Sequence, residues 1–424
     1  MPIDFTLSDQ QNAIRGMARS FATNVLSTAS SSYEKYPTQR ERFQSLRPFY
    51  RQAVGGGMIK GMIPQQLGGM GAGVLESTLL VEEMYKVDRS LSLTIFATGL
   101  GLSPLLVGGT SAQHEEFLKP FLSGEGEPLA SLVHSEPTGT ANWLKKGAKG
   151  LQTVARKDGD DWIINGEKMW ASNCCGWDDR GADLQCVVCR YSQDGKEQDI
   201  SADPADAIMI LLVTRDIVEK NPRKSYDVLS HMELPGHTSS AGPHIKFTEF
   251  RVPSHNLLAA PGKGAPVVLQ CFTATAALVG AMATGIMAAT FEAALKFAKS
   301  DTRGGVLPII NHQSVSDLLI DIKIKTDTSR FLTWKAAHAL DNGLGGELAL
   351  EAKIYCSDSA VKVVTDAMSA IGMSSYNKET DFPRLLNDAM CLPLFDGGNV
   401  GIRRRALENL FLDEGYKPWA STFE

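Results

Sequence analysis

Two nucleotide-binding signatures are missing from this sequence. No G-x-G-x-x-G follows an expected strand and opens a helix, which argues against a Rossmann dinucleotide site. The P-loop signature G-x-x-x-x-G-K-[ST] is absent as well. An excess of positive charge is also lacking, because 42 Lys and Arg stand against 48 Asp and Glu, and a single run of three arginines at 403–405 makes no basic face. Nucleic acid is therefore not expected as a partner.

Cysteine is sparse and forms no framework. The seven cysteines are an odd number at irregular spacings. The first residues, MPIDFTLSDQQ, lack the basic and apolar segments of a secretory signal. We therefore expect free thiols and an intracellular protein, most simply a cytoplasmic one. The last residues, WASTFE, match no peroxisomal address, but a trimmed C-terminus would look the same, so a peroxisomal location stays open.

Only one stretch raises the question of a membrane span. Residues 264–291 contain no charged side chain, but they are rich in Ala, Gly and Thr and include Gln270. Membrane spans are more uniformly apolar than this. The run therefore predicts a helix buried on all sides within a bundle, and no membrane is expected as a partner.

The apolar pattern of residues 1–125 is helical. Ser8 followed by Gln11 is a capping-box start, and apolar residues then repeat at helical spacing. Further helical patterns cover 74–88 and 91–109. From about 261 to 424 the pattern is helical again, with long helices near 264–299, 312–342 and 347–371 and a last helix starting near Asn399.

Residues 126–260 alternate in the manner of strands. Asp158-Gly159 and Asn165-Gly166 are turn signals, and the segments DLQCVVCRY, AIMILLVT and HIKFTEFRVP predict further strands. We expect a compact antiparallel β domain, barrel-like or a packed sandwich. The predicted fold class is thus α+β, with the order helices, sheet, helices.

Cys186 and Cys189 have the spacing of a metal or redox pair. They fall in a predicted strand, where residues three apart point to opposite faces, so the two thiols would not converge. No second pair or nearby histidine cluster completes a zinc site. We expect structural cysteines and no metal.

Each of two stretches can be interpreted either as part of a phosphate-binding site or as an ordinary loop or helix end. After His134 the chain runs through a Thr-Gly-Thr turn, which offers backbone N–H groups and hydroxyls to a phosphate or a flavin edge, or forms a plain loop, the reading that composition favours. Arg303 lies beside two glycines at a helix end, where it is either a favourable charge at a C-cap or a clamp on phosphate oxygens.

The segment LFDGGNVGIRRR places a lone acid, Asp396, before three arginines. Asp396 is a turn residue in one interpretation, with Asn399 as N-cap of the following helix. In the other it is a base. Arg403 lies seven residues on, two helical turns if the segment is all helix, and would keep the carboxylate ionised in a dry pocket. An ionised, aligned carboxylate can take a proton from carbon.

These residues, with the three-part order, resemble the acyl-CoA dehydrogenase superfamily. The resemblance is carried by GEGEPLASLVHSEPTGTANWL, FAKSDTRGG, HQSVSDLLID and PLFDGGNVGIRRR, and it runs from the first helix to YKPWAST. It implies an N-terminal helical domain, a central β domain and a C-terminal four-helix bundle. It also implies FAD bound without a Rossmann fold, and a homotetramer built as a dimer of dimers.

The resemblance assigns residues to the cofactor. The turn after residue 133 and the segment 170–172 match positions along the flavin ring, and the SDTRGG and HQS segments match positions at the pyrophosphate and adenosine. A loop in SAIGMSSY matches one offered to a neighbouring subunit's FAD. The implied cofactor-binding residues are Val133, His134, Ser135, Thr140, Ala141, Asn142, Trp170, Ala171, Ser172, Arg303, His312, Gln313, Ser369, Gly372, Gly397 and Gly398.

The resemblance also implies the catalytic set Asp396, Arg403 and Thr275. The superfamily base is usually a glutamate in a YEG context, whereas here the context is FDG, as in the branch that oxidises nitroalkanes. Thr275 stands where that branch carries a serine, so the hydroxyl is kept but β-branching stiffens χ1. The implied reaction takes a neutral nitroalkane and O₂ to an aldehyde or ketone, nitrite and hydrogen peroxide.

Two alternatives share the expected fold. An acyl-CoA dehydrogenase or oxidase would need a base that reaches a thioester α-carbon, and aspartate is one methylene shorter than glutamate. A flavin-dependent amine N-monooxygenase often lacks the carboxylate base altogether, so Asp396 counts against it.

Overall fold

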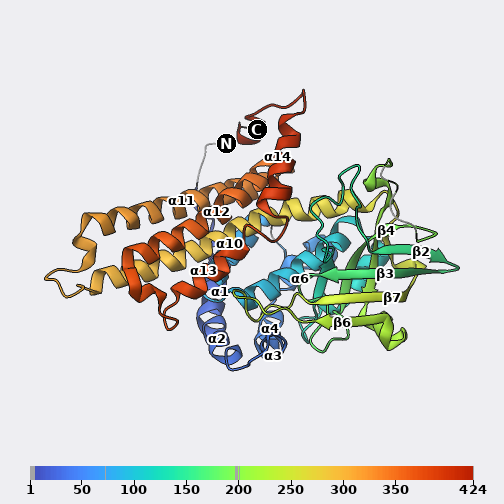
Figure 1. The fold of residues 1–424 in the computed structure, drawn as a ribbon, viewed down its shortest axis with the longest axis horizontal. Coiled ribbons are helices and arrows are strands. Elements are labelled where there is room, and N and C mark those ends of the chain that lie inside the picture. Colours follow the sequence, from blue (N-terminus) through green and yellow to red (C-terminus); the bar gives the residue numbers. More distant parts are fainter. Residues whose placement is uncertain (1–4, 72, 196–198, 200, 424) are drawn as a thin grey trace.

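The computed structural model describes all residues except 1–4, 72, 196–198, 200 and 424. Helices from both ends of the chain pack together at one side of the molecule, and the sheet lies at the other (Figure 1). The predicted order of helices, sheet and helices is confirmed. The central sheet is mixed rather than wholly antiparallel, because β1 (Ala130–Val133) and β2 (Val154–Asp158) both pair in parallel with β4 (Leu184–Tyr191).

The N-terminal helices begin as the sequence predicts. Ser8 caps α1 through a capping box with Gln11, because each side chain bonds the other's backbone N–H. The helices of this region are α1 (Asp9–Phe21), α2 (Ser27–Tyr33), α3 (Gln39–Ser45), α4 (Arg47–Gly55), α5 (Val74–Tyr85), α6 (Arg89–Gly108), α7 (Ser111–Phe117) and α8 (Lys119–Leu122). A π-helical turn, Ala22–Leu26, joins α1 to α2.

Among the residues that the structure describes, eight strands form one sheet in the order β6-β7-β3-β2-β4-β5-β8, with β1 beside β4. Asp158-Gly159 is the predicted hairpin turn, but Asn165-Gly166 lies inside β3, where the register shifts against β7. An Asn-Gly pair therefore marks a bulge there, because glycine reaches its φ of +142° without cost. The strands are β1 (Ala130–Val133), β2 (Val154–Asp158), β3 (Asp161–Met169), β4 (Leu184–Tyr191), β5 (Ile208–Thr214), β6 (Tyr226–Ser230), β7 (His244–Pro253) and β8 (Leu257–Ala259), with α9 (Arg215–Lys220) after β5.

Cys186 and Cys189 lie on opposite faces of β4, as predicted. Cys186 packs into the large core shared with the helices, and Cys189 packs into the second core on the other side of the sheet. Both thiols are fully buried and free.

In the described part of the chain, the C-terminal bundle consists of α10, α11, α12 and α13. The N-terminal helix α5 packs against two of them, α10 (Gly264–Ser300) and α11 (Gln313–Asp341). The helices after the sheet are α10 (Gly264–Ser300), α11 (Gln313–Asp341), α12 (Gly346–Ile371), α13 (Phe382–Cys391), α14 (Arg404–Phe411) and α15 (Ala420–Phe423). In the described part of the chain, α6 and α10 are long and apolar enough to cross a membrane, but 61% and 56% of their apolar windows are buried in the protein. The expected helix at 264–291 forms and is mostly buried over residues 276–287, but Leu269 near its start is 48% exposed, so the helix is not buried on all sides.

The chain between α13 and α14 differs from the expected helix. Residues Asn399–Arg403 form a π-helical turn that continues into α14, and Gly398 takes the N-cap position. The side chain of Asn399 turns inward to Ser357 and Asp358 on α12 and so does not cap the helix. The prediction of an Asn399 N-cap is therefore wrong, because a buried amide finds stronger partners on the neighbouring helix.

Candidate active site

Asp396 sits in the loop between α13 and the π-turn, with its side chain only 5% exposed. Its φ is +51°, in the left-handed region that aspartate tolerates better than most residues. The following residue, Gly397, is also left-handed, with φ of +75°. The two together turn the chain sharply and direct the carboxylate into the protein.

Both oxygens of the Asp396 carboxylate are held. Thr275 on α10 donates its hydroxyl to Oδ1 at 2.9 Å, and the Arg403 guanidinium donates to Oδ2 at 2.9 Å. Arg403 also donates to the backbone carbonyl of Asp396 from Nε at 3.0 Å and to the carbonyl of Phe272 at 3.0 Å. The structure therefore brings the three predicted catalytic residues together.

The pairing of Asp396 with Arg403 does not come from a shared helix face. Asp396 precedes the helical segment, and Arg403 folds back from the end of the π-turn onto the loop. Gly397 makes room for this approach, because a Cβ at that position would lie 3.0 Å from the Arg403 Nε. The predicted contact between Asp396 and Arg403 therefore exists, but the prediction that they share a helix face is wrong.

Burial and charge act in opposite directions on the base. Burial raises the pKa of Asp396 above its usual value, while Arg403, Lys353 and the Thr275 hydroxyl each lower it. Burial prevails, so the pKa stays raised. A carboxylate of raised pKa is a stronger base, and the neighbouring cations favour its ionised form.

The predicted flavin-contacting turn begins where β1 ends, at Val133. His134 is buried, its ring packing edge-on against Trp143 at 4.6 Å and against Phe272 at 5.6 Å between centroids. Its Nε2 has no hydrogen-bond partner among the residues that the structure describes. Burial and nearby Lys168 lower the pKa of His134 to about 3, so the ring is neutral.

A buried ion pair holds this turn in place. Lys168 on β3 donates to the His134 carbonyl at 2.8 Å and to the Glu136 carboxylate at 3.0 Å. Glu136 in turn accepts from the backbone N–H groups of Gln152 and Thr153. The next part of the turn, around Thr140 and Asn142, is left open at the surface.

The segment after β3 presents a ring to solvent. Trp170 is 50% exposed and has a φ of +69°, which is rare for a bulky residue. Ala171 after it is buried, and the Ser172 carbonyl accepts a hydrogen bond from Ser131 on β1 at 2.7 Å. Backbone strain of this kind concentrates at binding and catalytic sites.

Arg405 links the turn to the segment that follows Asp396. Its guanidinium donates to the Ala141 carbonyl at 3.1 Å and to the Asn142 side chain at 2.9 Å. A Cβ at Gly401 would lie 3.5 Å from the Ala141 side chain, so the two segments are in contact. The predicted ring-contacting residues and the predicted base thus form one group around the junction of sheet and bundle.

This group fits a flavin. The unpartnered Nε2 of His134, the Thr140 hydroxyl, the Asn142 amide nitrogen and the half-exposed Trp170 ring offer donors, acceptors and an apolar face to a flat polar ring. Val133, Ser135, Ala171 and Ser172 belong to the same segments. Gly397 and Gly398 serve the base loop, Gly397 through its left-handed turn and Gly398 as N-cap of the π-turn.

The remaining predicted cofactor residues lie elsewhere on the chain. Arg303 follows the far end of α10 and donates to the Ser374 hydroxyl at 2.8 Å and to the Ile371 carbonyl. The helix between Thr275 and Ser300 is about 38 Å long at 1.5 Å per residue. His312 and Gln313 at the start of α11, and Ser369 and Gly372 at the end of α12, are exposed at this end of the bundle.

Sequence reasoning missed two residues of the site. It gave no role in the site to Arg405 or to Lys353, whose side chain is fully buried. Lys353 does carry a signal, because it follows Ala352 in a stripe of buried residues on α12 that continues through Cys356 and Ala360. A lysine in an apolar stripe needs a buried partner.

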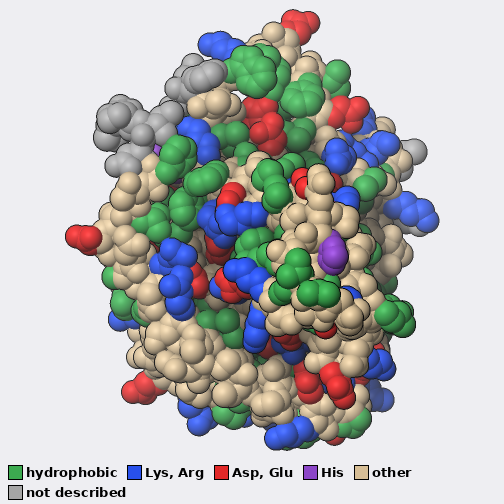
Figure 2. Space-filling view, turned by 90° about the vertical axis from the view of Figure 1, so that its left-hand side faces the viewer, with side chains coloured by type: hydrophobic (Ala, Val, Ile, Leu, Met, Phe, Trp, Pro, Cys, Tyr) green, Lys and Arg blue, Asp and Glu red, His purple; other side chains and the backbone are tan. Residues whose placement is uncertain are grey.

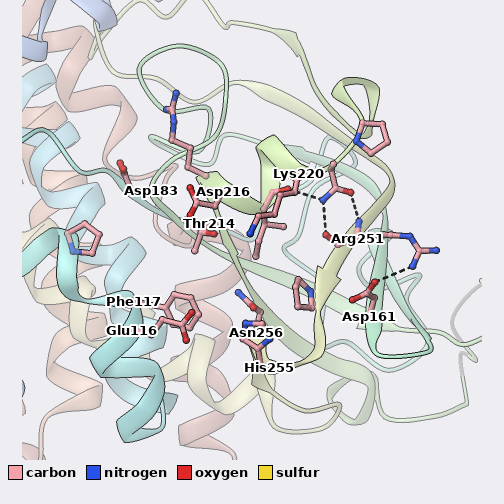
Figure 3. Close-up of a pocket in the computed structure, with 16 residues that line it drawn as sticks. Glu116, Phe117, Asp161, Asp183, Thr214, Asp216, Lys220, Arg251, His255 and Asn256 are labelled. Carbon is pink, nitrogen blue, oxygen red and sulfur yellow. Dashed lines mark hydrogen bonds and ion pairs between the residues drawn. The ribbon is translucent and has the colours of Figure 1, made fainter.

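A separate cavity of about 520 Å³ lies between α7 and the strand ends around α9 (Figure 3). Asp183, Lys220, Arg251 and Asn256 are among the residues that line it, and Arg251 forms an ion pair with Asp161. Its lining shares no residue with the Asp396 group in the described part of the chain.

Comparison with known proteins agrees with this geometry. Residues 8–125 match the acyl-CoA dehydrogenase N-terminal domain and residues 262–410 match the acyl-CoA dehydrogenase C-terminal domain. The nitroalkane oxidase of Fusarium oxysporum is 53% identical over 99% of this chain and 98% of its own length. The nitroalkane oxidase of Podospora anserina is 52% identical over 100% and 99%.

Solved structures give the same result. A nitroalkane oxidase active-site mutant crystallised with 1-nitrooctane superposes with a TM-score of 0.98 at 52% identity, covering 99% of this chain and 100% of that one. The three-part fold, the buried acid at the junction and this full-length similarity lead to one conclusion. The chain belongs to the nitroalkane oxidase branch of the acyl-CoA dehydrogenase family.

Proposed function

We propose that this chain is an FAD-dependent oxidase that converts neutral nitroalkanes and O₂ to aldehydes or ketones, nitrite and hydrogen peroxide. The observation that carries the proposal is the buried Asp396 carboxylate, held by Thr275 and Arg403 within the group of residues that fits a flavin. FAD, when bound, would supply the electron acceptor for the oxidation and the reaction with O₂. The similar proteins named nitroalkane oxidase support the same substrate class.

Asp396 removes the proton from the carbon that bears the nitro group. The nitro group spreads the negative charge left on the substrate, so a carboxylate is a sufficient base once it is desolvated and aligned. Thr275 and Arg403 occupy one direction at each oxygen, and each oxygen keeps a further lone pair for the substrate proton. Arg403 keeps the carboxylate ionised before the transfer and pairs with it again after the proton leaves.

The neutral state of His134 suits this step. A protonated imidazole beside the substrate would compete with Arg403 for the anionic product, whereas the low pKa of His134 keeps its ring uncharged. The Phe272 ring packs against His134, and the Arg403 guanidinium lies 5.9 Å from its centroid. These contacts give an apolar surrounding that excludes water from the carboxylate.

The test compares two forms of one substrate. Asp396→Asn should keep bound FAD but lose at least about a hundredfold in kcat/KM for neutral nitroethane, the usual contribution of a general base. Ethyl nitronate, which is already deprotonated, should still be oxidised at a rate near that of the unmodified enzyme. Asp327→Asn, at a partly exposed carboxylate on α11 that pairs with Lys323 and Arg330, is the control and should leave both rates unchanged.

Equal loss on neutral nitroethane and on the nitronate would contradict the assignment of Asp396 as the base. Nitrite and hydrogen peroxide release should be measured for a panel of nitroalkanes beside a panel of acyl-CoA thioesters. Turnover of the thioesters in place of the nitroalkanes would assign the chain to acyl-CoA dehydrogenation instead.

We further propose that the enzyme is a homotetramer in which one FAD contacts more than one chain. The separation of about 38 Å along α10 supports this, because a single cofactor at Asp396 would not reach Arg303 of the same chain. The end of the bundle near Arg303 also exposes apolar side chains, with Val306 96% and Met373 82% exposed. Figure 2 faces this end and shows hydrophobic and basic side chains side by side. Such a surface is typical of an interface.

Hybrid oligomers test this arrangement. Asp396→Asn and Arg303→Ala chains should each be poorly active alone at limiting FAD. Coexpressed chains should regain activity, because some sites in a mixed oligomer combine an intact Asp396 from one chain with an intact Arg303 from another. Activity no higher than the sum of the two separate preparations, together with a monomer by light scattering, would refute the shared site.

A further inference from the structure

Lys353 is a fully buried lysine on α12, and its side chain is among the largest that the protein removes from solvent. A buried ammonium is costly unless it is paired and hydrogen-bonded. Its position in a stripe with Ala349, Ala352 and Cys356 would suit an apolar side chain. A lysine here therefore calls for a physical reason beyond packing.

The ammonium of Lys353 bonds the loop that carries Asp396. Its Nζ donates to the Gly397 carbonyl at 3.1 Å and to the Asn399 side-chain oxygen at 2.7 Å. The Asn399 amide donates to the Ser357 hydroxyl at 2.9 Å and to Asp358 at 2.8 Å. Lys353 and Asn399 thus fasten the residues directly after the base to α12.

The segment that Lys353 and Asn399 hold includes a strained stretch of backbone. Asp396 and Gly397 are consecutive left-handed residues, and such a backbone persists only where its surroundings fix it. Arg403 holds the Asp396 carbonyl and Lys353 holds the Gly397 carbonyl, so each of the two successive carbonyls accepts from a cation. The orientation of the carboxylate depends on both.

Charge links the same residues. The groups that face Lys353 are Asp396, Arg403, Asp358 and the Cys391 thiol. Burial lowers the pKa of Lys353 to about 8, and Asp396 opposes that decrease. The Cys271 thiol also faces Asp396, but burial raises its pKa to about 11, so it is uncharged at neutral pH. Lys353 and Arg403 are accordingly the two cations that act on the base.

We propose that Lys353 is a positioning residue for proton abstraction: it holds the left-handed loop through the Gly397 carbonyl and supplies a second positive charge to the Asp396 carboxylate. The inference rests on the proposed function, since it concerns the same base. It assigns to Lys353 no contact with substrate or flavin. Its role is exerted through the conformation and the ionisation of Asp396.

Two substitutions separate the two parts of the role. Lys353→Gln keeps a donor for the Gly397 carbonyl but removes the charge, whereas Lys353→Met removes both. Lys362→Met on the same helix is the matched control, because Lys362 is exposed and pairs only locally with Asp366. FAD content and thermal unfolding should be measured for each variant, so that folding defects are recognised.

The decisive readout is the pH dependence of kcat/KM for neutral nitroethane, followed beside ethyl nitronate. Loss of a nearby cation should raise the pKa of Asp396, so the acidic limb of the kcat/KM profile should shift to higher pH by about one unit in both Lys353 variants. At pH values below the limb, kcat/KM should then be about tenfold lower than in the unmodified enzyme. Lys353→Met should also lose activity on the plateau, because the loop is no longer held. Nitronate oxidation should stay within about twofold, and Lys362→Met should match the unmodified enzyme.

An acidic limb at the same pH in a folded, FAD-containing Lys353→Gln enzyme would overturn the electrostatic role. Equal losses on nitroethane and nitronate in both variants would reduce Lys353 to a purely structural residue and overturn the proposal. Failure of the unmodified enzyme to oxidise either compound would instead refute the proposed function. The two failures are therefore distinguishable.

Discussion

Replacement of Arg403 by lysine keeps the positive charge and removes the planar guanidinium. In the structure that guanidinium, only 4% exposed, donates to the Asp396 carbonyl, the Asp396 carboxylate and the Phe272 carbonyl at once. A single ammonium on a shorter side chain cannot reach all three in this geometry. We expect Arg403→Lys to lose roughly one charge-assisted hydrogen bond in the transition state, worth about 2 kcal/mol. That corresponds to about a thirtyfold decrease in kcat/KM.

The assay is anaerobic bleaching of the bound FAD absorbance by neutral nitroethane, by 1,1-dideuterated nitroethane and by ethyl nitronate. Proton abstraction should be slowed, so the deuterium effect should stay large, while the nitronate should react almost as before. A decrease in kcat/KM of less than about threefold would show that the planar arrangement of the guanidinium donors is unimportant. An equal loss on the nitronate would place Arg403 in a later step and refute the reasoning.

Three further predictions concern the same loop and the buried core. Thr275→Val removes the hydroxyl from the base and should raise the acidic limb of kcat/KM by about one pH unit, whereas Thr275→Ser should not; identical limbs would contradict the hydrogen bond to Asp396. Gly397→Ala, at a φ of +75° and against the Arg403 guanidinium, should lower activity on nitroethane more than on the nitronate; an unchanged ratio would contradict it. Asp388→Asn should lower the free energy of unfolding by about 3–5 kcal/mol in urea titrations, because it breaks a buried ion pair; a change below about 1 kcal/mol would contradict the burial argument.

The last of these predictions depends on pH in a defined direction. Burial by itself raises the pKa of Asp388, but Arg89, His237 and a backbone N–H together lower it below the ordinary value. The stability that Asp388 contributes is therefore present above the unfolded-state pKa of about 3.9 and is lost as the pH falls through the folded-state pKa. Asp388→Asn should remove this part of the acid-induced loss of stability.

Short sequence patterns predicted helices and strands because interactions between residues close in the sequence determine where these elements form. The capping box at Ser8 starts α1, and the charge-free run from Gly264 becomes the buried helix α10. The alternating pattern placed the β2–β3 hairpin, but it could not distinguish the Asn165-Gly166 bulge from a turn. The parallel pairing of β1 and β2 with β4 was also out of reach, because it joins segments far apart in the chain.

The candidate site was predictable only in part, for the same reason. The residues alone left Asp396 as a turn residue or a base paired with Arg403, and the family resemblance decided for the base and added Thr275; their hydrogen bonds agree with it. The π-turn that lets Arg403 fold back follows from contacts with α10 and α12 that no local spacing encodes. The Gly397 carbonyl that Lys353 bonds lies 44 residues away in the sequence. The sequence could therefore indicate that Lys353 is buried, but not which group it bonds.

The left-handed backbone at residue 396 limits which acid can occupy it. Aspartate and asparagine are enriched at positive φ because their short polar side chains bond locally, while longer side chains gain nothing comparable there. Asp396→Glu would therefore retain the charge yet lose both the conformational fit and the spacing to Thr275. A longer acid at this position would need the loop to be rebuilt first, so the main-chain shape, as well as the length of the side chain, determines which residue can serve as the base.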